Sequence, residues 1–240
     1  MIIHGKYGRG TIYLSGGMQH TSPDDPLGAK WRLVCSAKLK EMGYFPLDIA
    51  ELDAAYAALH GELWRFTTTE ELLERKSNIR KHFVYTDLQL IVNDSDAIII
   101  LYDESVRLGA GTISECQIAY SYDLPIFLVN AYPDLNDVPG WLQALTTKIF
   151  SSFGELYEYL NSLPIGVLKR DVYGNRHSGS HYLCSLCGSP FEKGKQHFVS
   201  KVSPLYCKSC VDIVKTTHED HPDRYQFFLD YLVTESLTEL

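Results

Sequence analysis

The chain has 240 residues, of which 45% are hydrophobic and 22% are charged, and its formal net charge is -8. This composition excludes a disordered chain, and no run approaches the roughly 18 consecutive apolar residues of a membrane span. We therefore expect a soluble protein with one medium and one small domain, and the absence of an apolar signal segment near the N-terminus favours a cytoplasmic location.

Charge is distributed unevenly along the chain. Between residues 169 and 217, eight Lys and Arg stand against three Asp and Glu, a surplus of five positive charges. Since the whole chain carries -8, the remainder holds about -13. Nucleic-acid backbones are bound by clustered positive charge. The front part of the chain is therefore a poor candidate for nucleic-acid binding, and the tail is a weak one.

The first predicted strand covers residues 11–15 and ends at Gly16 and Gly17. A Pro-containing segment at 22–26 predicts a helix start, and an apolar stripe at residues 27, 31, 34, 35 and 39 predicts a helix over 27–42 that Gly43 ends. A second strand follows at 44–47. Two further helices are predicted, over 51–63 and 69–92, the second from apolar residues at helical intervals.

Residues 96–103 form a nearly continuous apolar run whose β-branched residues suit a strand buried on both faces. A Gly-containing loop, a helix from about 112, strands at 126–129 and 149–150, and a helix over 154–163 follow. Strands that alternate with helices predict an α/β fold with a doubly wound parallel sheet, Rossmann or flavodoxin-like. Its ligand site is expected at the carboxyl ends of the strands, where Gly16, Asp103 and the loop at Gly109 would gather.

The sequence predicts two domains. Residues 1–165 form the α/β domain, residues 166–180 a linker, and residues 181–240 a small module with a closing helix over 219–240 whose apolar stripe contains Phe227, Phe228 and Tyr231.

Four of the six cysteines fall into two Cys-x-x-Cys pairs. Cys184 with Cys187 and Cys207 with Cys210 are separated by nineteen residues. Each pair delivers two thiolates to one side of a tetrahedral ion, so this spacing predicts a structural zinc site in a zinc ribbon. We expect no organic cofactor. Such ribbons serve nucleic-acid contact, protein contact or stabilisation, and the sequence does not choose among them.

Glu115 has two interpretations. Its spacing from Thr112 fits a capping box, in which a helix-start Thr and a Glu three residues later satisfy each other's amides. Alternatively, a carboxylate in the first turn of a helix at the mouth of a parallel sheet is kept ionised by the helix dipole. Such a group can attack a sugar carbon and form a covalent glycosyl-enzyme.

Several segments carry a resemblance in their order along the chain. They are Thr-Ile-Tyr-Leu-Ser-Gly-Gly at 11–17, Asp-Leu-Gln-Leu-Ile at 87–91, Ser-Asp-Ala at 95–97, and Gly-Thr-x-x-Glu at 111–115. Over about residues 10–160 the chain resembles the nucleoside 2-deoxyribosyltransferase family, which includes the 2'-deoxynucleoside 5'-monophosphate N-glycosidases.

The resemblance implies roles for three residues. Glu115 would be the nucleophile on C1' of the deoxyribose, Tyr13 would orient it, and Asp87 would assist the leaving base and its proton. It also implies the same doubly wound sheet, a nucleoside or nucleotide substrate, and homo-oligomers. Gly109 stands where transferases of the family carry an acidic residue and the monophosphate hydrolases a phosphate-binding Ser, so recognition of base and phosphate stays open.

Further candidates for substrate binding surround the expected mouth. Asp103 is suited to a sugar hydroxyl or a base, and the remaining candidates are Gly16, Gly17, Met18, Gly111 and Thr112. Trp31 and Arg32 are candidates to contact a base or a phosphate. The alternative for Trp31 is a core position, and the alternative for Arg32 is a solvated one. Two other functions stay open: hydrolysis of the N-glycosidic bond of NAD or another nucleotide by a defence effector, and a non-catalytic nucleotide sensor or scaffold whose ribbon binds a partner.

Overall fold

The computed structural model of the chain describes residues 8–18, 20–50, 68–71, 73, 84–169, 183–184, 187–190, 196–200, 205–220 and 232–236. The chain divides into two compact units, Met1–Lys169 and Arg170–Leu240.

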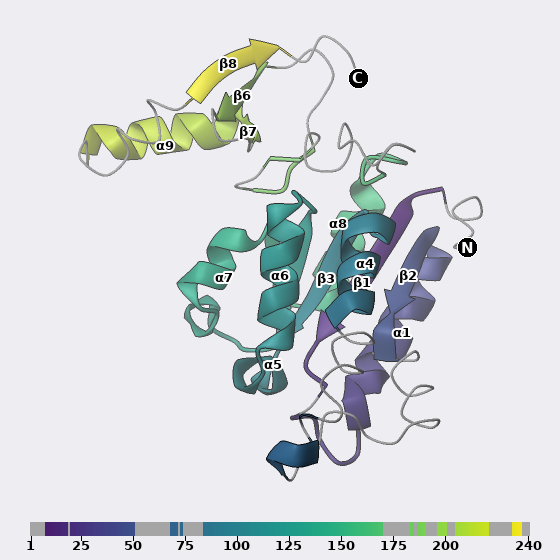
Figure 1. The fold of residues 1–240 in the computed structure, drawn as a ribbon. Helices are drawn as coiled ribbons and strands as arrows, with labels where there is room; N and C mark the ends of the chain where they lie inside the picture. The colour runs from purple at the N-terminus through teal and green to yellow at the C-terminus, as the bar shows by residue number, and fades with distance from the viewer. Residues whose placement is uncertain are drawn as a thin grey trace. The chain divides into compact units, whose positions relative to one another are not determined.

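A five-stranded parallel sheet forms the centre of the first unit (Figure 1). Its strand order, β2-β1-β3-β4-β5, is the flavodoxin-like order of a doubly wound sheet, which confirms the predicted fold class. The order reverses at the neighbouring strands β1 and β3. The strands are β1 (Gly10–Gly16), β2 (Tyr44–Asp48), β3 (Ala97–Tyr102), β4 (Ile126–Asn130) and β5 (Lys148–Phe150).

Helices cover both faces of this sheet, with α6 in front of it and α8 behind it in Figure 1. The helices described in the first unit are α1 (Ala29–Glu41), α4 (Thr86–Gln89), α5 (Glu104–Leu108), α6 (Gly111–Ser121), α7 (Gly140–Leu145) and α8 (Phe153–Ser162). Short turns of other helical types cover Pro26–Gly28, Leu90–Asp94 and Leu135–Asp137.

The core follows from the alternation of side chains along the strands. Successive residues of a strand point to opposite faces of the sheet. Tyr13, Ile98 and Ile100 pack in one buried cluster with Cys116 and Ala119 of α6. Ser15 lies two residues after Tyr13 and shares its face of β1. The hydroxyl groups of both residues are thus directed to the side of the sheet that α6 covers.

The predicted strands all occur, and Gly43 ends α1 with a positive φ of 85°. The predicted apolar stripe of this helix is wrong at Val34, which is 65% exposed. Arg32 and Ser36 are buried instead, because α1 faces the end of the sheet as well as its surface. Of the helix predicted over 69–92, the described residues 69–71, 73 and 84–92 are all helical, while the helix predicted over 51–63 lies outside the described residues.

The second unit contains an antiparallel sheet in the order β7-β6-β8 and one described helix. The elements are β6 (Gln196–Ser200), β7 (Leu205–Cys207), α9 (Lys208–Asp220) and β8 (Leu232–Ser236). The closing helix predicted over 219–240 is therefore wrong at Leu232–Ser236, where β8 pairs with β6 along its whole length. Pairing with a distant strand decides this segment. Phe227, Phe228 and Tyr231 lie outside the described residues.

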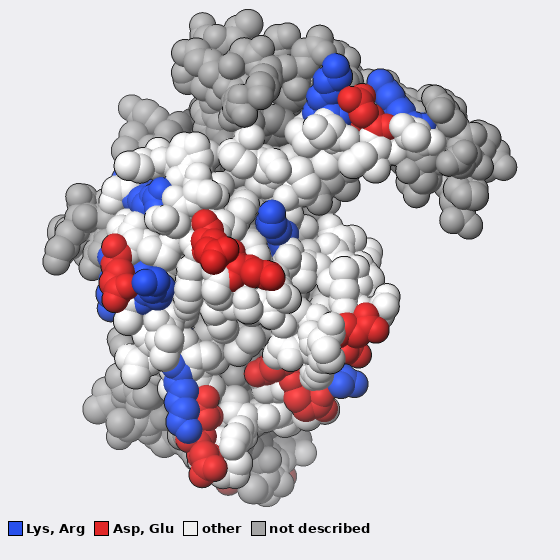
Figure 2. Space-filling view, turned by 180° about the vertical axis from the view of Figure 1, so that it is seen from behind, with Lys and Arg blue, Asp and Glu red and all other residues white. Residues whose placement is uncertain are grey.

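Among the described residues on the face drawn in Figure 2, the charged side chains form no extended basic patch. Blue side chains are scattered there, and most have an acidic side chain beside them. Among the residues that the structure describes, no helix has the length and apolar character needed to cross a membrane.

Candidate active site

The carboxylate of Glu115 is held by two hydroxyl groups from the central strand. Tyr13 donates a hydrogen bond from its phenol to Oε1 over 3.0 Å, and Ser15 donates one from Oγ to Oε2. Both donors are fully buried. Glu115 reaches them from the second turn of α6, a hundred residues further along the chain. Each carboxylate oxygen therefore has a fixed donor near the carboxyl end of β1.

The interpretation of Glu115 as a helix cap is wrong. α6 begins at Gly111, its N-cap is Ala110, and no side chain caps it. Thr112 lies inside the helix and is buried, and Glu115 lies beyond the first turn. The expected placement of Glu115 in the first turn is also wrong. The hydroxyls of β1 compete successfully for the carboxylate because α6 packs across this strand.

Opposing effects set the charge state of Glu115. Burial raises the pKa of the Glu115 carboxyl, whereas hydrogen bonds from Ser15 and Tyr13 and the positive charge of Arg32 act to lower it. The ionised form is thus stabilised by specific groups rather than by water. A carboxylate whose solvation is supplied by fixed donors is a common feature of reactive sites.

The loops after β1 and β3 touch at the point where the strand order reverses. A Cβ on Gly17 would lie 1.9 Å from Oγ of Ser105 and 2.7 Å from its backbone carbonyl carbon, so only glycine fits there. Asp103 begins α5 by accepting hydrogen bonds from the backbone N–H of Val106 and the hydroxyl of Ser105. This capping role of Asp103 is structural, and binding of substrate by its carboxylate stays a prediction.

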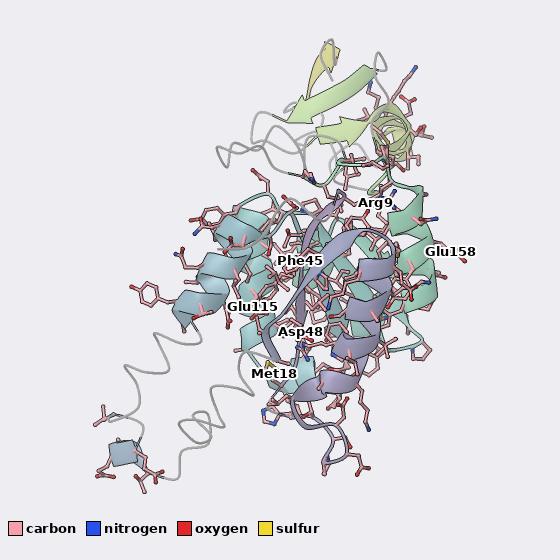
Figure 3. All side chains as sticks on the ribbon, turned by 90° about the vertical axis from the view of Figure 1, so that its right-hand side faces the viewer. Arg9, Met18, Phe45, Asp48, Glu115 and Glu158 are labelled. Atoms are coloured by element: carbon pink, nitrogen blue, oxygen red, sulfur yellow. The ribbon has the colours of Figure 1, made fainter. Side chains whose placement is uncertain are left out.

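Other predicted residues lie around the same edge of the sheet. Met18 is half-buried and packs against the core below α6. In Figure 3, Met18 and Asp48 lie below Glu115, and Arg9 lies at the far, amino end of the strands. Gly111 has open space where a Cβ would stand. Asp87 lies on α4, which contacts α6, and its role with the leaving base stays a prediction.

From the sequence, Ser15 was assigned no role in the site, and Arg32 was assigned no contact with the end of β1. The sequence does contain a signal for Ser15, because a residue two positions after Tyr13 in a strand lies on the same face of the sheet. Arg32 was expected to contact a base or phosphate or to be solvated, and the solvated alternative is wrong because the side chain is fully buried. Its Nη2 donates to the carbonyl of Gly16 over 2.7 Å. Trp31 packs between the Arg32 guanidinium and Phe153.

The second unit brings the four predicted cysteine ligands together. The sulfur atoms of Cys184, Cys187, Cys207 and Cys210 all lie within 4.8 Å of one another. Gly188, at a φ of 69°, turns the chain so that its N–H donates to the carbonyl of Cys184 over 2.7 Å. The N–H of Cys207 donates to Sγ of Cys184 over 3.3 Å. Four sulfur donors so arranged fit a metal ion with tetrahedral coordination.

Comparison with known proteins adds a likeness of fold. No protein-family model matches the chain, and no curated protein matches it. Among solved structures, the chain is similar to a 2-deoxyribosyltransferase from the psychrotolerant bacterium Bacillus psychrosaccharolyticus, a biocatalyst for the synthesis of antiviral and antitumoral nucleosides. The TM-score is 0.40, the identity is 13%, and the match covers 76% of this chain and 99% of the other. At this distance, the function has to be argued from the residues of the site.

The charge of Glu115 has a measurable effect on stability. Because the folded state raises the pKa of this carboxyl, it binds the proton more tightly than the unfolded chain does, and stability falls as pH rises through the window between the two pKa values. Glu115→Gln removes this charge. We expect the variant to melt a few degrees above the wild type at pH 7 to 8, with the difference disappearing as pH approaches about 4.

Glu158→Gln is the matched control for this measurement, since Glu158 is exposed on α8 (Figure 3). Thermal melts of the three proteins followed by circular dichroism between pH 4 and 8 provide the test. A Glu115→Gln protein that melts below the wild type at pH 7 would show that the hydrogen bonds to the ionised form outweigh its burial.

The cysteine cluster predicts one metal ion per chain. Cys184→Ser replaces a buried sulfur ligand, so we expect metal content measured by mass spectrometry to fall to a small fraction of the wild-type value and the second unit to lose stability. Cys35→Ser is the control, since Cys35 is buried in the first unit and should leave the metal content unchanged. Equal metal content in the Cys184→Ser protein and the wild type would rule out this site.

Proposed function

We propose that the first unit cleaves or exchanges the N-glycosidic bond of a 2'-deoxynucleoside or its 5'-monophosphate through a covalent glycosyl-Glu115 intermediate. The observation that carries this proposal is the carboxylate of Glu115, fixed by the hydroxyls of Tyr13 and Ser15 at the carboxyl end of the central strand. The reversal of strand order beside it is where doubly wound sheets bind their ligands.

In the first step, a carboxylate oxygen of Glu115 attacks C1' of the sugar. The bond between C1' and the base nitrogen breaks, and its electron pair leaves with the base. The departing base takes up a proton, for which Asp87 on the neighbouring helix α4 is the proposed donor. Tyr13 and Ser15 keep the carboxylate at one position, so little reorganisation accompanies the attack.

In the second step, water or a second base attacks C1' from the face that the first base left, and the proton that this nucleophile loses passes to the carboxylate of Asp87. The bond to Glu115 breaks, and the carboxylate returns to the two hydroxyl donors. Two inversions give net retention. Water yields hydrolysis, and a second base yields exchange. The same hydrogen bonds that fix Glu115 as nucleophile also stabilise its charge as leaving group, so they serve both steps.

The site favours catalysis over simple nucleotide sensing. Burial opposes the ionised carboxylate of Glu115, and the fold meets this with two hydroxyl donors on one strand. A binding module has no need of this arrangement, because a protonated or neutral side chain would fill the same space at lower free energy. Hydrolysis of the same type of bond in NAD is the alternative within the enzyme class.

We further propose that the four cysteines bind zinc in a structural role. All four ligands are thiolates, so no coordination position is left for a substrate, and a tetrahedral sulfur set suits zinc. In this proposal residues 1–165 carry the chemistry and residues 181–240 form the zinc ribbon, which contacts nucleic acid or protein or only stabilises the chain.

The decisive experiment measures base release. Purified protein is incubated with deoxynucleosides, their 5'-monophosphates and NAD, and free or exchanged base is quantified by chromatography. We expect release by the wild type and a loss of at least about a thousandfold in Glu115→Gln, since removing a nucleophile abolishes the covalent route. Glu158→Gln should behave as the wild type. Retained activity in Glu115→Gln would refute the nucleophile, and no release by the wild type would favour the sensor.

The hydroxyl donors predict a graded effect. Tyr13→Phe removes one hydrogen bond to the charged carboxylate and leaves the ring, so we expect base release to fall about 10- to 100-fold. Tyr120→Phe makes the same change at an exposed position of α6 and should leave the rate unaltered. A Tyr13→Phe rate equal to that of the wild type would show that this hydrogen bond does not support catalysis.

A further inference from the structure

Arg32 is a fully buried cation at the edge of the sheet that carries the candidate active site. Burying a guanidinium is unfavourable unless hydrogen bonds and negative charge replace the water that it loses. Accordingly, burial lowers the pKa of Arg32, while the nearby charge of Asp48 and then that of Glu115 act to raise it. Burying this charge costs a large free energy, so the groups that compensate for it indicate the role of Arg32.

Carbonyl groups at both ends of one loop accept the hydrogen bonds of Arg32. Nη2 donates to Gly16, the last residue of β1, over 2.7 Å. Nη1 donates to Leu27 over 2.9 Å and to Gly28 over 3.0 Å, just before α1 begins. The guanidinium thereby connects the end of β1 to the start of α1. Gly16 directly follows Ser15, so this connection also fixes the strand residue that donates to Glu115.

Carbonyls carry no net charge, so the counter-ions of Arg32 have to be carboxylates. Nε has no hydrogen-bond partner and lies 3.9 Å from Oδ1 of Asp48. That oxygen already accepts from the backbone N–H of Ala50 over 3.0 Å. Asp48 is therefore only a partial partner, and Glu115 is the next strongest source of negative charge acting on Arg32.

The groups that determine the charge of Glu115 come from every element around it. Tyr13 and Ser15 of β1 bind it directly, and Arg32 of α1 is the cation that acts on it. Among the described residues, further titratable groups on the neighbouring elements are the buried thiol of Cys116 in α6, Asp48 at the end of β2 and Asp103 after β3, which both act on Arg32, and Asp87 on α4.

We propose that Arg32 is a positioning residue for Glu115: its three carbonyl contacts hold the Gly16–Gly28 loop and the Ser15 hydroxyl in place, and its buried positive charge favours the ionised form of the carboxylate. In this proposal Arg32 acts through Ser15 and Glu115 rather than through contact with the substrate. The negative charge of Asp48 also interacts with Arg32 and so weakens the effect of Arg32 on Glu115. Only the expected effect of Arg32 on catalysis rests on the proposed function. The effect of Arg32 on the charge of Glu115 can be tested whether or not the protein is an enzyme.

The link is tested by measuring the pKa of Glu115 directly. The side-chain carboxyl of glutamate is labelled with carbon-13, the Glu115 resonance is assigned by its absence in Glu115→Gln, and its chemical shift is followed with pH. We expect Arg32→Met to raise this pKa by about one unit or more. Arg32→Lys, which retains a charge, should shift it less. Asp48→Asn should lower it, because Arg32 then has one competing anion fewer.

Lys40→Met is the control, since it removes a positive charge from an exposed position of the same helix and should leave the Glu115 titration unchanged. A folded Arg32→Met protein in which Glu115 titrates as in the wild type would overturn the inference. Should Arg32→Met fail to fold, Arg32→Lys and Asp48→Asn decide, and a folded Asp48→Asn protein without a downward shift would overturn it as well. A purely structural Arg32 would alter stability in these variants without moving the titration.

Base release separates this inference from the proposed function. If the wild type is active, the acidic limb of its pH profile should move to higher pH in Arg32→Met, together with the carboxyl titration. Absence of base release from any substrate would refute the proposed function while the titration still decides the role of Arg32. Base release with an unchanged titration would refute the role of Arg32 alone.

Discussion

The hydrogen bonds from Tyr13 and Ser15 to Glu115 are the contact on which the candidate site depends. They require three conditions at once: a strand with hydroxyl residues at alternate positions, a helix that crosses this strand, and a glutamate in its second turn. The parallel sheet supplies the first two, because side chains two residues apart share a face and α6 covers that face. The site is thus a property of the sheet rather than of a flexible loop.

The carboxyl end of β1, close to Glu115, is fixed from two sides. On the β3 side, Gly17 lies so close to Ser105 that no side chain fits between them. On the α1 side, Arg32 binds the carbonyls of Gly16 and Gly28. The backbone between these contacts follows the carboxyl end of β1, where substrate would bind. Such preorganisation reduces the reorganisation that a charged transition state otherwise requires.

The second unit relies on a different physical principle. Its described sheet has three strands, and the sulfur atoms of four cysteines lie within 4.8 Å of one another. Binding of a metal by these thiolates contributes free energy to folding itself. All four candidate ligands are cysteines, which fits the structural role that we propose for this cluster, while the proposed chemistry belongs to the first unit.

The sequence by itself determined the five strands of the first unit, their doubly wound class and the four cysteines that come together. These follow from local hydrophobic patterns and from the spacing of ligand residues. It also singled out Glu115 and Tyr13, although through a resemblance as well as through their positions.

Only the tertiary structure decided the contacts of Glu115. Its spacing from Thr112 fits a helix cap equally well, but its hydrogen-bond donors in the structure are Tyr13 and Ser15, about a hundred residues away in the chain. The burial of Arg32 and the strand at Leu232–Ser236 were decided in the same way. Hydrogen bonds and strand pairing between distant segments depend on how the elements pack, and no local pattern records that packing.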